Sequence, residues 1–417
     1  MKIKFKKIII TLLLAFMVLA NFNFVFSANT AEKQNKKTDL PFISADAFIV
    51  LDNKTNKILY NKNETKKMYP ASTTKILTAL LTLENCELDD IVTANYNAIS
   101  VIPEGYSTAN IQANEKLTVE QLLNLLLIPS ANDAANVLAE HVGGSIDNFI
   151  SMMNKKLEEL GLKNSHFTNA FGMHDDDHYT TAEDLAKIMQ YCLKYDHFKE
   201  IASKAKCTIP ATNKSAARTY TSTNELILPN YKNYYEYITA GKTGTTTQAK
   251  QCLVTSAFRD DLELICVILG SEKRFVDAKN LYEYTYSNYS IKNIVNEKDS
   301  VTSIEVEGAT SETKNLDLLV NETIPVLINN STSISEIEPN IKLNEKISAP
   351  IEEGTVLGTV TYKVEGVEYT SNLVASHFVE KSKLLLYVLI AVVAIIFLFI
   401  LCMIIAKNKK RKSRYTY

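Results

Sequence analysis

The strongest constraint on this chain is an uncharged apolar stretch near its end, from Leu384 to Ala406. It exceeds the roughly 20 residues that an α-helix needs to cross a bilayer. A dense cluster of Lys and Arg follows it, and basic residues concentrate on the cytoplasmic side of membrane spans. We therefore expect a single transmembrane helix at 384–406, a cytoplasmic tail at 407–417, and an extracytoplasmic part before them. A buried core helix is the alternative, but such a helix seldom ends in so many basic residues.

The beginning of the chain has the pattern of a secretory signal peptide. Lysines precede an apolar stretch at 8–20, and small residues follow at Ser27 and Ala28. We predict a signal peptide at 1–27, with a retained membrane helix as the alternative. Residues 28–40 are polar and lack periodicity, so they are expected to form a flexible leader.

The charge between these two ends argues against nucleic-acid binding. The chain has 45 Lys and Arg against 47 Asp and Glu, and its ends hold ten of the basic residues and no acidic ones. This leaves 35 basic against 47 acidic residues between the ends, without the basic patch that contacts phosphates.

Five of the six cysteines fall between the two ends without a metal-binding spacing. Free thiols are the default interpretation, although an exported chain permits a disulfide.

Hydrophobic patterns predict two folded domains between the leader and the span. Two β-prone runs flank a polar turn at 52–56, helical patterns dominate from about 72 to 195, and strand patterns return near Lys242. We expect an α+β first domain at 41–290, with an antiparallel sheet and helices. Short β-prone runs then predict a small all-β domain at 295–378.

Three short motifs, in one order along the chain, point to its chemistry. Residues 72–75 read Ser-Thr-Thr-Lys, 130–132 read Ser-Ala-Asn, and 242–244 read Lys-Thr-Gly. Ser-x-x-Lys and Ser-x-Asn recur elsewhere, but Lys-Thr-Gly occurs once. Only the Ser-x-x-Lys at 72–75 follows Pro-Ala and precedes an apolar helical run. Their order and context predict an acyl-transfer site with a serine nucleophile.

The predicted catalytic residues are Ser72, Lys75 and Ser130. Ser72 and Lys75 are three positions apart, so a helix would place both on one face. A lysine can take the proton of a serine only if burial or a nearby positive charge keeps its amine neutral. Lys242 could supply that charge. Ser130 is expected on a short connector, from which it could relay a proton to the leaving amine.

Five further residues are predicted to bind the substrate. Asn132 would orient the lysine base and the substrate amide, and Lys242 and Thr243 would hold a terminal carboxylate. The backbone N–H of Thr245 would stabilise the oxyanion together with the free N–H groups at the helix start. Gly244 has no side chain, so it would let the substrate backbone approach closely.

These motifs and their flanking residues resemble the low-molecular-weight penicillin-binding proteins, the serine D-alanyl-D-alanine carboxypeptidases. The resemblance covers most of residues 40 to 378 and is carried by 70–75, 129–135, 166–169, 178–186, 240–244, 252–254 and 349–375. It implies a fold shared with serine β-lactamases and a peptidoglycan stem peptide ending in D-Ala-D-Ala as substrate. It also implies covalent inhibition by β-lactams and neither a cofactor nor a metal.

The chain departs from that family in two places. Thr245 stands where relatives often carry a histidine or an aromatic residue. An apparent full membrane span replaces the usual amphipathic surface anchor.

Arg274 occupies a position where relatives carry an arginine near the cleft, although it could equally be a surface charge. The run His-Asp-Asp-Asp-His at 174–178 is interpreted as a solvated acidic loop rather than a metal site.

We therefore expect a membrane-tethered D-Ala-D-Ala carboxypeptidase that acts through an acyl-enzyme on Ser72. A serine β-lactamase on the same fold is one alternative, disfavoured by the β-rich domain and the span. A non-catalytic muropeptide-binding protein is the other, disfavoured because all the reacting groups are present. The sequence identifies no protein partner and no oligomeric state.

Overall fold

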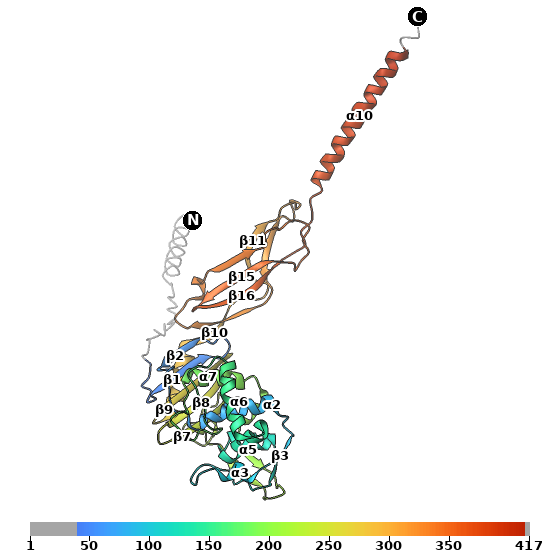
Figure 1. Cartoon of the computed structure of the whole chain (residues 1–417). Helices are drawn as coiled ribbons and strands as arrows, with labels where there is room; N and C mark the ends of the chain where they lie inside the picture. The colour runs from blue at the N-terminus through green and yellow to red at the C-terminus, as the bar shows by residue number, and fades with distance from the viewer. Residues whose placement is uncertain (1–39, 413–417) are drawn as a thin grey trace, which may run out of the picture. The chain divides into compact units, whose positions relative to one another are not determined.

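The computed structural model describes residues 40–412 of the chain. The predicted signal peptide at 1–27, nearly all of the leader at 28–40 and the tail from 413 onward lie outside the described residues. Figure 1 shows a domain of helices and strands, a domain of strands, and a long C-terminal helix. The expected α+β class, followed by an all-β domain and an apolar helix, is confirmed.

A five-stranded antiparallel sheet forms the centre of the first domain (Figure 1). The predicted hairpin is present, and the three strand patterns expected near Lys242 form neighbouring strands. The first strand pairs with the last, which brings the two ends of the domain together. In the order β2-β1-β9-β8-β7, the strands are β1 (Ala47–Asp52), β2 (Ile58–Lys62), β7 (Ile238–Thr246), β8 (Lys250–Arg259) and β9 (Leu262–Ser271).

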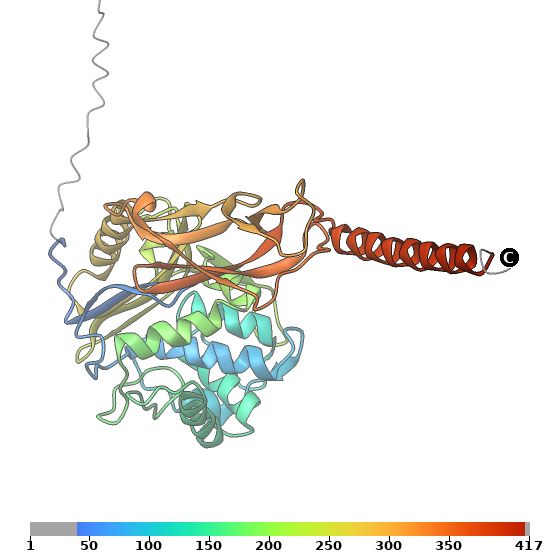
Figure 2. The same cartoon turned by 90° about the horizontal axis from the view of Figure 1, so that it is seen from above.

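Both faces of this sheet are covered, which explains the uninterrupted apolar run from Leu264 to Leu269 in β9. Side chains alternate between the two faces of a strand. Ile265 and Val267 belong to the core beneath the helical half, whereas Leu264 and Cys266 belong to the core beneath α9 (Arg274–Asn288). Figure 2 shows the helices of residues 75–195, in blue and green, together on one side of the strands.

The helical half supplies two of the three motifs. Its predicted caps are confirmed, because the hydroxyls of Thr118 and Thr181 accept the N–H groups of Gln121 and Asp184. A short strand pair at 91–93 and 116–118 interrupts the predicted helical region, and another at 206–209 and 218–221 follows it. These strands are too short for a pattern of alternating side chains to reveal them. The elements are α2 (Lys75–Asn85), β3 (Ile91–Thr93), α3 (Tyr96–Ser100), β4 (Lys116–Thr118), α4 (Val119–Leu127), α5 (Asn132–Gly143), α6 (Ile146–Glu159), α7 (Ala182–Cys192), α8 (Asp196–Ala202), β5 (Lys206–Ile209) and β6 (Arg218–Thr221).

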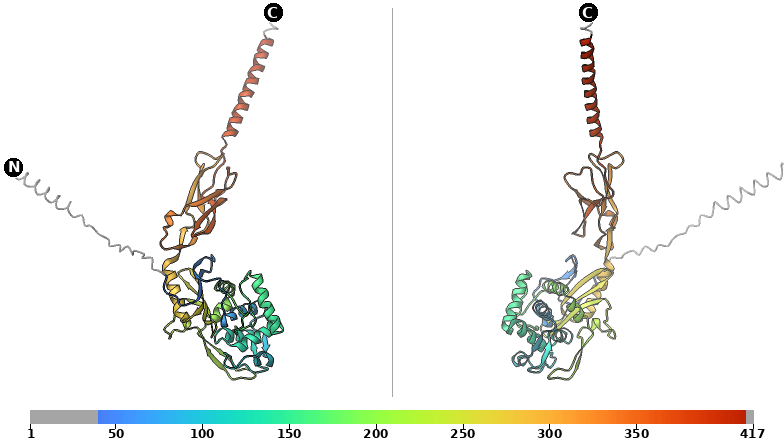
Figure 3. Two further views of the ribbon diagram at one scale, coloured as in Figure 1. Left: turned by 60° about the vertical axis from the view of Figure 1, so that its left-hand side comes forward. Right: turned by 90° about the vertical axis from the view of Figure 1, so that its right-hand side faces the viewer.

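The second domain consists of strands, as Figure 3 also shows. These strands surround an apolar core of their own. Leu316, Leu318, Val360 and Leu373 are fully buried in it. The residues between the two predicted domains, 291–294, belong to a strand that pairs with β13. The strands are β10 (Tyr289–Val295), β11 (Ser300–Glu305), β12 (Asn315–Val320), β13 (Ile324–Asn329), β14 (Pro339–Leu343), β15 (Val356–Val364) and β16 (Val367–Ala375).

The C-terminal helix α10 (Leu384–Lys412) carries the apolar stretch. Within the described residues it is the one helix long and apolar enough to cross a membrane, from Leu384 to Lys407, with a mean hydropathy of 3.6. None of this window is buried against the rest of the chain. The helix continues beyond the predicted end at 406, because Lys and Arg are good helix formers. It fits a membrane anchor.

Candidate active site

The nucleophile candidate Ser72 lies in a tight turn that precedes α2. The sequence predicts a helix start here, and the structure confirms it with a 3-10 turn, η1 (Ala71–Thr74). The hydroxyls of Thr73 and Thr74 donate to the carbonyls of Pro70 and Ala71, at 2.7 and 2.9 Å. Ala71 has a φ of +49°, a strained value for a residue with a Cβ. These bonds hold Ser72 at the surface of a turn whose other residues are buried.

Lys75 is fully buried and directed at Ser72. Its Nζ lies 2.9 Å from Ser72 Oγ, 2.6 Å from Asn132 Oδ1 and 2.9 Å from the carbonyl oxygen of Phe171. A neutral amine has two hydrogens and one lone pair. The atoms that face Lys75 from Asn132 and Phe171 are oxygens, which only accept, so they take the two hydrogens, and the lone pair is left for the Ser72 hydroxyl. Burial, and then the charge of Lys242, lower the pKa of Lys75 well below its ordinary value.

Ser130 and Lys242 form the second contact of the site. Ser130 lies between α4 and α5 with a φ of +64°, which turns its side chain toward β7. The buried Lys242 donates from Nζ to Ser130 Oγ and to the carbonyl of Thr243, both at 2.8 Å. Burial, and then the charge of Arg274, lower the pKa of Lys242 to about 7. The Ser130 hydroxyl is thus bonded to an amine that can give or take a proton near neutral pH.

The strand β7 lies directly against the nucleophile turn at Gly244. A Cβ at this position would lie 2.8 Å from the carbonyl oxygen of Pro70 and 2.9 Å from the nitrogens of Ser72 and Thr73. The expected reason for this glycine was close approach of the substrate, whereas the observed neighbour is the protein's own backbone. The close contact brings the N–H of Ser72 beside β7, and Thr245 is the next residue of that strand.

Arg274 lines the cleft, so of its two interpretations the cleft arginine is confirmed and the surface charge is not. Its Nη1 donates to the carbonyl of Gly244 at 2.8 Å and to the hydroxyl of Thr245 at 2.7 Å. The hydroxyl of Thr243 is 2.6 Å from that of Thr223. The guanidinium and these hydroxyls provide the hydrogen-bond donors that a carboxylate requires.

The motifs meet at a cleft of about 550 Å³. Six predicted residues line it: Ser72, Ser130, Asn132, Thr243, Gly244 and Thr245. The other two, Lys75 and Lys242, lie buried behind Ser72 and Ser130. The sequence did not reveal that the cleft is also lined by Gly105, Tyr106, Ser107, Phe171, Gly172, Met173, Thr223, Thr246, Thr247 and Gln248.

Among these missed residues, Gly172 and its neighbours form a loop pressed against the nucleophile turn. Asn169 Oδ1 accepts the N–H groups of Gly172 at 2.8 Å and Met173 at 2.9 Å. Gly172 has a φ of +89°, and a Cβ there would lie 1.8 Å from the carbonyl oxygen of Ala71. The loop delivers the Phe171 carbonyl to Lys75. The Asn-x-x-Gly pattern signals a turn, but no local pattern shows where that turn docks.

The interpretation of 174–178 as a solvated loop is wrong for His178, which is 1 % exposed. Its Nδ1 accepts the N–H of Thr168 at 3.0 Å, so Nε2 carries the hydrogen and donates to the hydroxyl of Thr74 at 2.8 Å. Burial lowers the pKa of His178 to about 3. A neutral His178 thus supports the nucleophile turn through Thr74, which in turn donates to Ala71.

A candidate metal-ligand group lies outside the cleft. Within the described residues, the ligand atoms of Cys86, Asp90 and His141 lie within 4.8 Å of one another. They are at or beyond the ends of α2 and α5 that are remote from the motifs. The remaining cysteines of the folded domains are free and buried.

Comparisons with known proteins agree with this geometry. A family model described as D-alanyl-D-alanine carboxypeptidase matches residues 32–273, and one described as penicillin-binding protein 5, C-terminal domain, matches residues 289–381. The chain is similar to D-alanyl-D-alanine carboxypeptidase DacF of Bacillus subtilis, with 30% identity over 89% of this chain and 94% of that protein. It is also similar to DacC of Escherichia coli, with 28% identity over 83% of this chain and 86% of that one.

Two solved structures share the fold. Penicillin-binding protein 5 of Haemophilus influenzae is 27% identical, with a TM-score of 0.62, over 82% of this chain and 99% of that one. A peptidoglycan synthesis regulatory factor of Streptococcus pneumoniae is 25% identical, with a TM-score of 0.67, over 82% of this chain and 100% of that one. Both alignments extend well beyond the first domain.

Proposed function

The chain belongs to the D-alanyl-D-alanine carboxypeptidase family, the low-molecular-weight penicillin-binding proteins, and we propose that Ser72 is its nucleophile. The protein is a serine-type peptidase, a D-alanyl-D-alanine carboxypeptidase of the family that acts on peptidoglycan stem peptides and binds β-lactams. The proposal for Ser72 depends on one observation, the 2.9 Å contact between its Oγ and the buried amine of Lys75.

Acylation begins when Ser72 Oγ attacks the carbonyl carbon of the penultimate D-Ala. Its proton passes to the lone pair of Lys75, and the carbonyl oxygen becomes an oxyanion. The N–H groups of Ser72 and Thr245 stabilise that oxyanion. The C–N bond then breaks, the leaving amine takes the hydroxyl proton of Ser130, and Lys242 returns a proton to Ser130. The products are an ester on Ser72 and free D-alanine.

Deacylation reverses the roles, with water as the nucleophile. Lys75 and Lys242 first regain their starting protonation by exchange with solvent. Lys75 then takes a proton from water as the water oxygen attacks the ester carbonyl. The C–O bond to Ser72 breaks, and the Ser72 oxygen takes that proton back from Lys75. A β-lactam forms the same ester, but its leaving amine stays tethered to the acyl group. The open ring therefore occupies the path of the incoming water.

The substrate carboxylate is proposed to lie between Thr243, Thr245 and Arg274. Arg274 already donates to the Thr245 hydroxyl, and Thr243 lies two residues earlier on β7, so its side chain is on the same face of that strand. Asn132 Nδ2 is free to bind the substrate amide while its Oδ1 holds Lys75. This arrangement favours a peptide that ends one residue after the scissile bond, as a carboxypeptidase requires.

We further propose a catalytic domain at 41–290, a β-rich domain at 295–378, a membrane span at 384–406 and a cytoplasmic tail at 407–417. The exposed apolar surface of α10 and the basic residues from Lys407 onward, which follow the apolar stretch, support the span. The catalytic domain then lies outside the cytoplasmic membrane, where the stem peptides of the cell wall are found.

The test is intact-protein mass spectrometry after penicillin, with D-alanine release from a D-Ala-D-Ala peptide assayed in parallel. The wild type should gain one penicilloyl adduct and release D-alanine, and Ser72→Ala should do neither. Ser203→Ala is the matched control, because Ser203 begins another Ser-x-x-Lys sequence far along the chain. An adduct retained in Ser72→Ala would refute the assignment. A transient adduct with consumed penicillin and intact peptide would indicate a β-lactamase.

A further inference from the structure

One wall of the cleft is the segment 105–111, which lies between α3 and β4. Gly105, Tyr106 and Ser107 line the cleft, and Ala109 and Ile111 anchor the segment in the core. The segment has no regular secondary structure, so its backbone groups must find partners elsewhere.

The start of α5 binds this segment on one side. The N–H of Asn132 donates to the carbonyl of Ser107 at 2.8 Å. The carboxylate of Asp133 accepts the N–H of Ala109 at 2.9 and 3.0 Å and that of Ile111 at 3.0 Å. The residue that holds Lys75 and its immediate neighbour are thus attached to the cleft wall.

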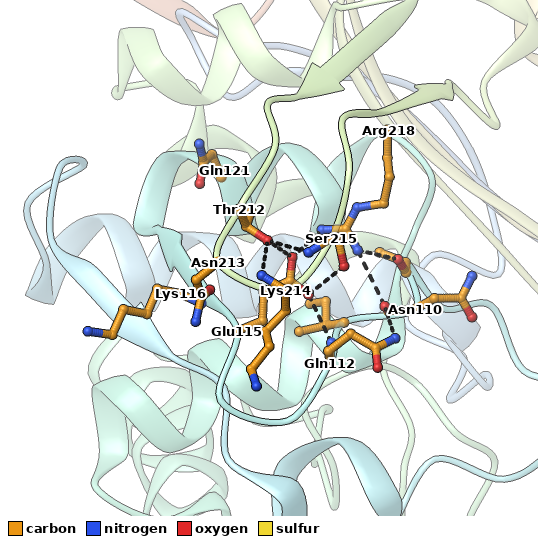
Figure 4. A network of polar contacts seen from close by, with 12 residues as sticks. Asn110, Gln112, Glu115, Lys116, Gln121, Thr212, Asn213, Lys214, Ser215 and Arg218 are labelled. Atoms are coloured by element: carbon orange, nitrogen blue, oxygen red, sulfur yellow. Dashed lines mark hydrogen bonds and ion pairs between the residues drawn. The ribbon is translucent and has the colours of Figure 1, made fainter.

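Strand β6 binds the same segment on the other side, as Figure 4 shows for Arg218. Arg218 Nη1 donates to the carbonyls of Ala109 and Asn110, each at 3.3 Å. The hydroxyl of Tyr220 donates to the carbonyl of Ala109 at 2.7 Å. The N–H groups of Ala109 and Ile111 thus bond to α5, and the carbonyls of Ala109 and Asn110 bond to β6, so the segment is held between the two elements.

Glu115 fixes the orientation of Arg218. Its side chain has no exposed surface, and Oε1 lies 2.6 Å from Arg218 Nη2. Oε1 also accepts the hydroxyl of Thr212 at 2.7 Å, and Oε2 accepts the N–H of Gln112 at 2.9 Å (Figure 4). A planar guanidinium binds the carboxylate through Nη2 and the two carbonyls through Nη1 in one fixed geometry, whereas an ammonium group would have to make all three contacts from a single nitrogen.

We propose that Arg218 and Glu115 are positioning residues that hold the segment 105–111 against the start of α5. Through Ser107 and Asp133 they fix Asn132, and through Asn132 they fix the amine of Lys75. The inference rests on the proposed roles of Ser72 and Lys75. Neither Arg218 nor Glu115 lines the cleft, so both act through the segment.

The test is the variant Arg218→Lys, which keeps the charge beside Glu115 but removes the fork. Arg259→Lys is the matched control, because Arg259 pairs with Glu283 at the far end of β8. We expect penicillin acylation to slow about five- to tenfold in Arg218→Lys, the effect of losing about one hydrogen bond's alignment, and not in Arg259→Lys. Amide hydrogen exchange of 106–112 should accelerate only in Arg218→Lys.

Glu115→Gln is the second variant, because it keeps the size of the side chain and removes its charge. It should slow acylation and accelerate the same amides. Wild-type acylation in a folded Arg218→Lys protein would overturn the proposal, as would an exchange increase spread evenly over the whole domain. If the wild type itself takes up no penicillin, the proposed function fails instead, and local exchange at 106–112 still decides whether Arg218 holds the segment.

Discussion

Gly172→Ala isolates the contact between the loop at 169–173 and the nucleophile turn. The added methyl group would stand 1.8 Å from the carbonyl oxygen of Ala71 and 2.9 Å from the nitrogen of Ser72. These are backbone atoms, so no side-chain rotation relieves the overlap. Real Cβ atoms essentially never approach another heavy atom closer than 3.0 Å. One of the two backbones must therefore move by roughly 1 Å, the difference between these distances, if the chain stays folded.

The magnitude follows from what that displacement does to Ser72. A misplacement of about 1 Å can cost about 100-fold in rate, because the reacting atoms leave their aligned geometry. The Phe171 carbonyl moves with Gly172, so Lys75 also loses an acceptor for one of its hydrogens. We expect penicillin acylation of Gly172→Ala to fall at least about 100-fold. The positive φ alone adds a conformational cost of about 1 kcal/mol.

Gly161→Ala is the matched control for that conformational cost. Gly161 has a φ of +72° and nothing within 4 Å of an added Cβ. It should lower the melting temperature by about 2–4 °C and leave the acylation rate unchanged. Stopped-flow acylation with a chromogenic β-lactam and a thermal melt of both variants separate the two effects. Acylation of Gly172→Ala at the wild-type rate would refute the steric argument.

Three more predictions concern protonation and anchoring. Burial lowers the pKa of Lys75 well below 10.5 and that of Lys242 to about 7. The acylation rate should therefore rise with pH as Lys75 loses its proton and fall above about 7 as Lys242 loses its own. Acylation rates measured from pH 5 to 9 should show this fall in the wild type and not in Lys242→Arg. Burial lowers the pKa of His178 from 6.5 to about 3, so on acidification the unfolded chain binds a proton that the folded chain excludes, and the folded state loses stability. The variant His178→Phe should have a lower melting temperature than the wild type at pH 7. Its melting temperature should also change less between pH 6 and pH 4. A chain that ends at residue 383 should keep D-alanine release and leave the detergent phase, because the apolar window at 384–407 is not buried against the rest of the described chain. Retention of the shortened chain in the detergent phase would contradict the anchor.

The sequence predicts those parts of the fold that local chemistry dictates. Thr118 and Thr181 precede good helix formers with Gln or acidic residues nearby, so both helix starts were predictable. The three motifs fall on a helix start, a connector and a strand because each local pattern favours that element. The hairpin at 47–62 has a polar turn of the expected kind.

Contacts between distant segments were not predictable, because the sequence shows no pattern for them. Phe171 contributes a backbone carbonyl, which any residue possesses. His178 lies among three aspartates that are typical of a solvated loop, yet its ring points to Thr74, on another part of the chain. Arg218 binds carbonyls of a segment with no regular structure. Each of these roles depends on which distant segment packs against the residue, and that packing is set by the core as a whole.

The strained residues of the site lie where distant segments press against one another. Ala71 and Ser130 have positive φ values although each carries a Cβ, and Gly172 has the same backbone region without that cost. Such conformations persist only where the surroundings over-determine them. Here α2 is buried over its first eight residues, and the loop and β7 press on the turn before it. The rigid core thus holds Ser72 in a conformation that an isolated turn would not keep, which is why small backbone displacements should cost so much activity.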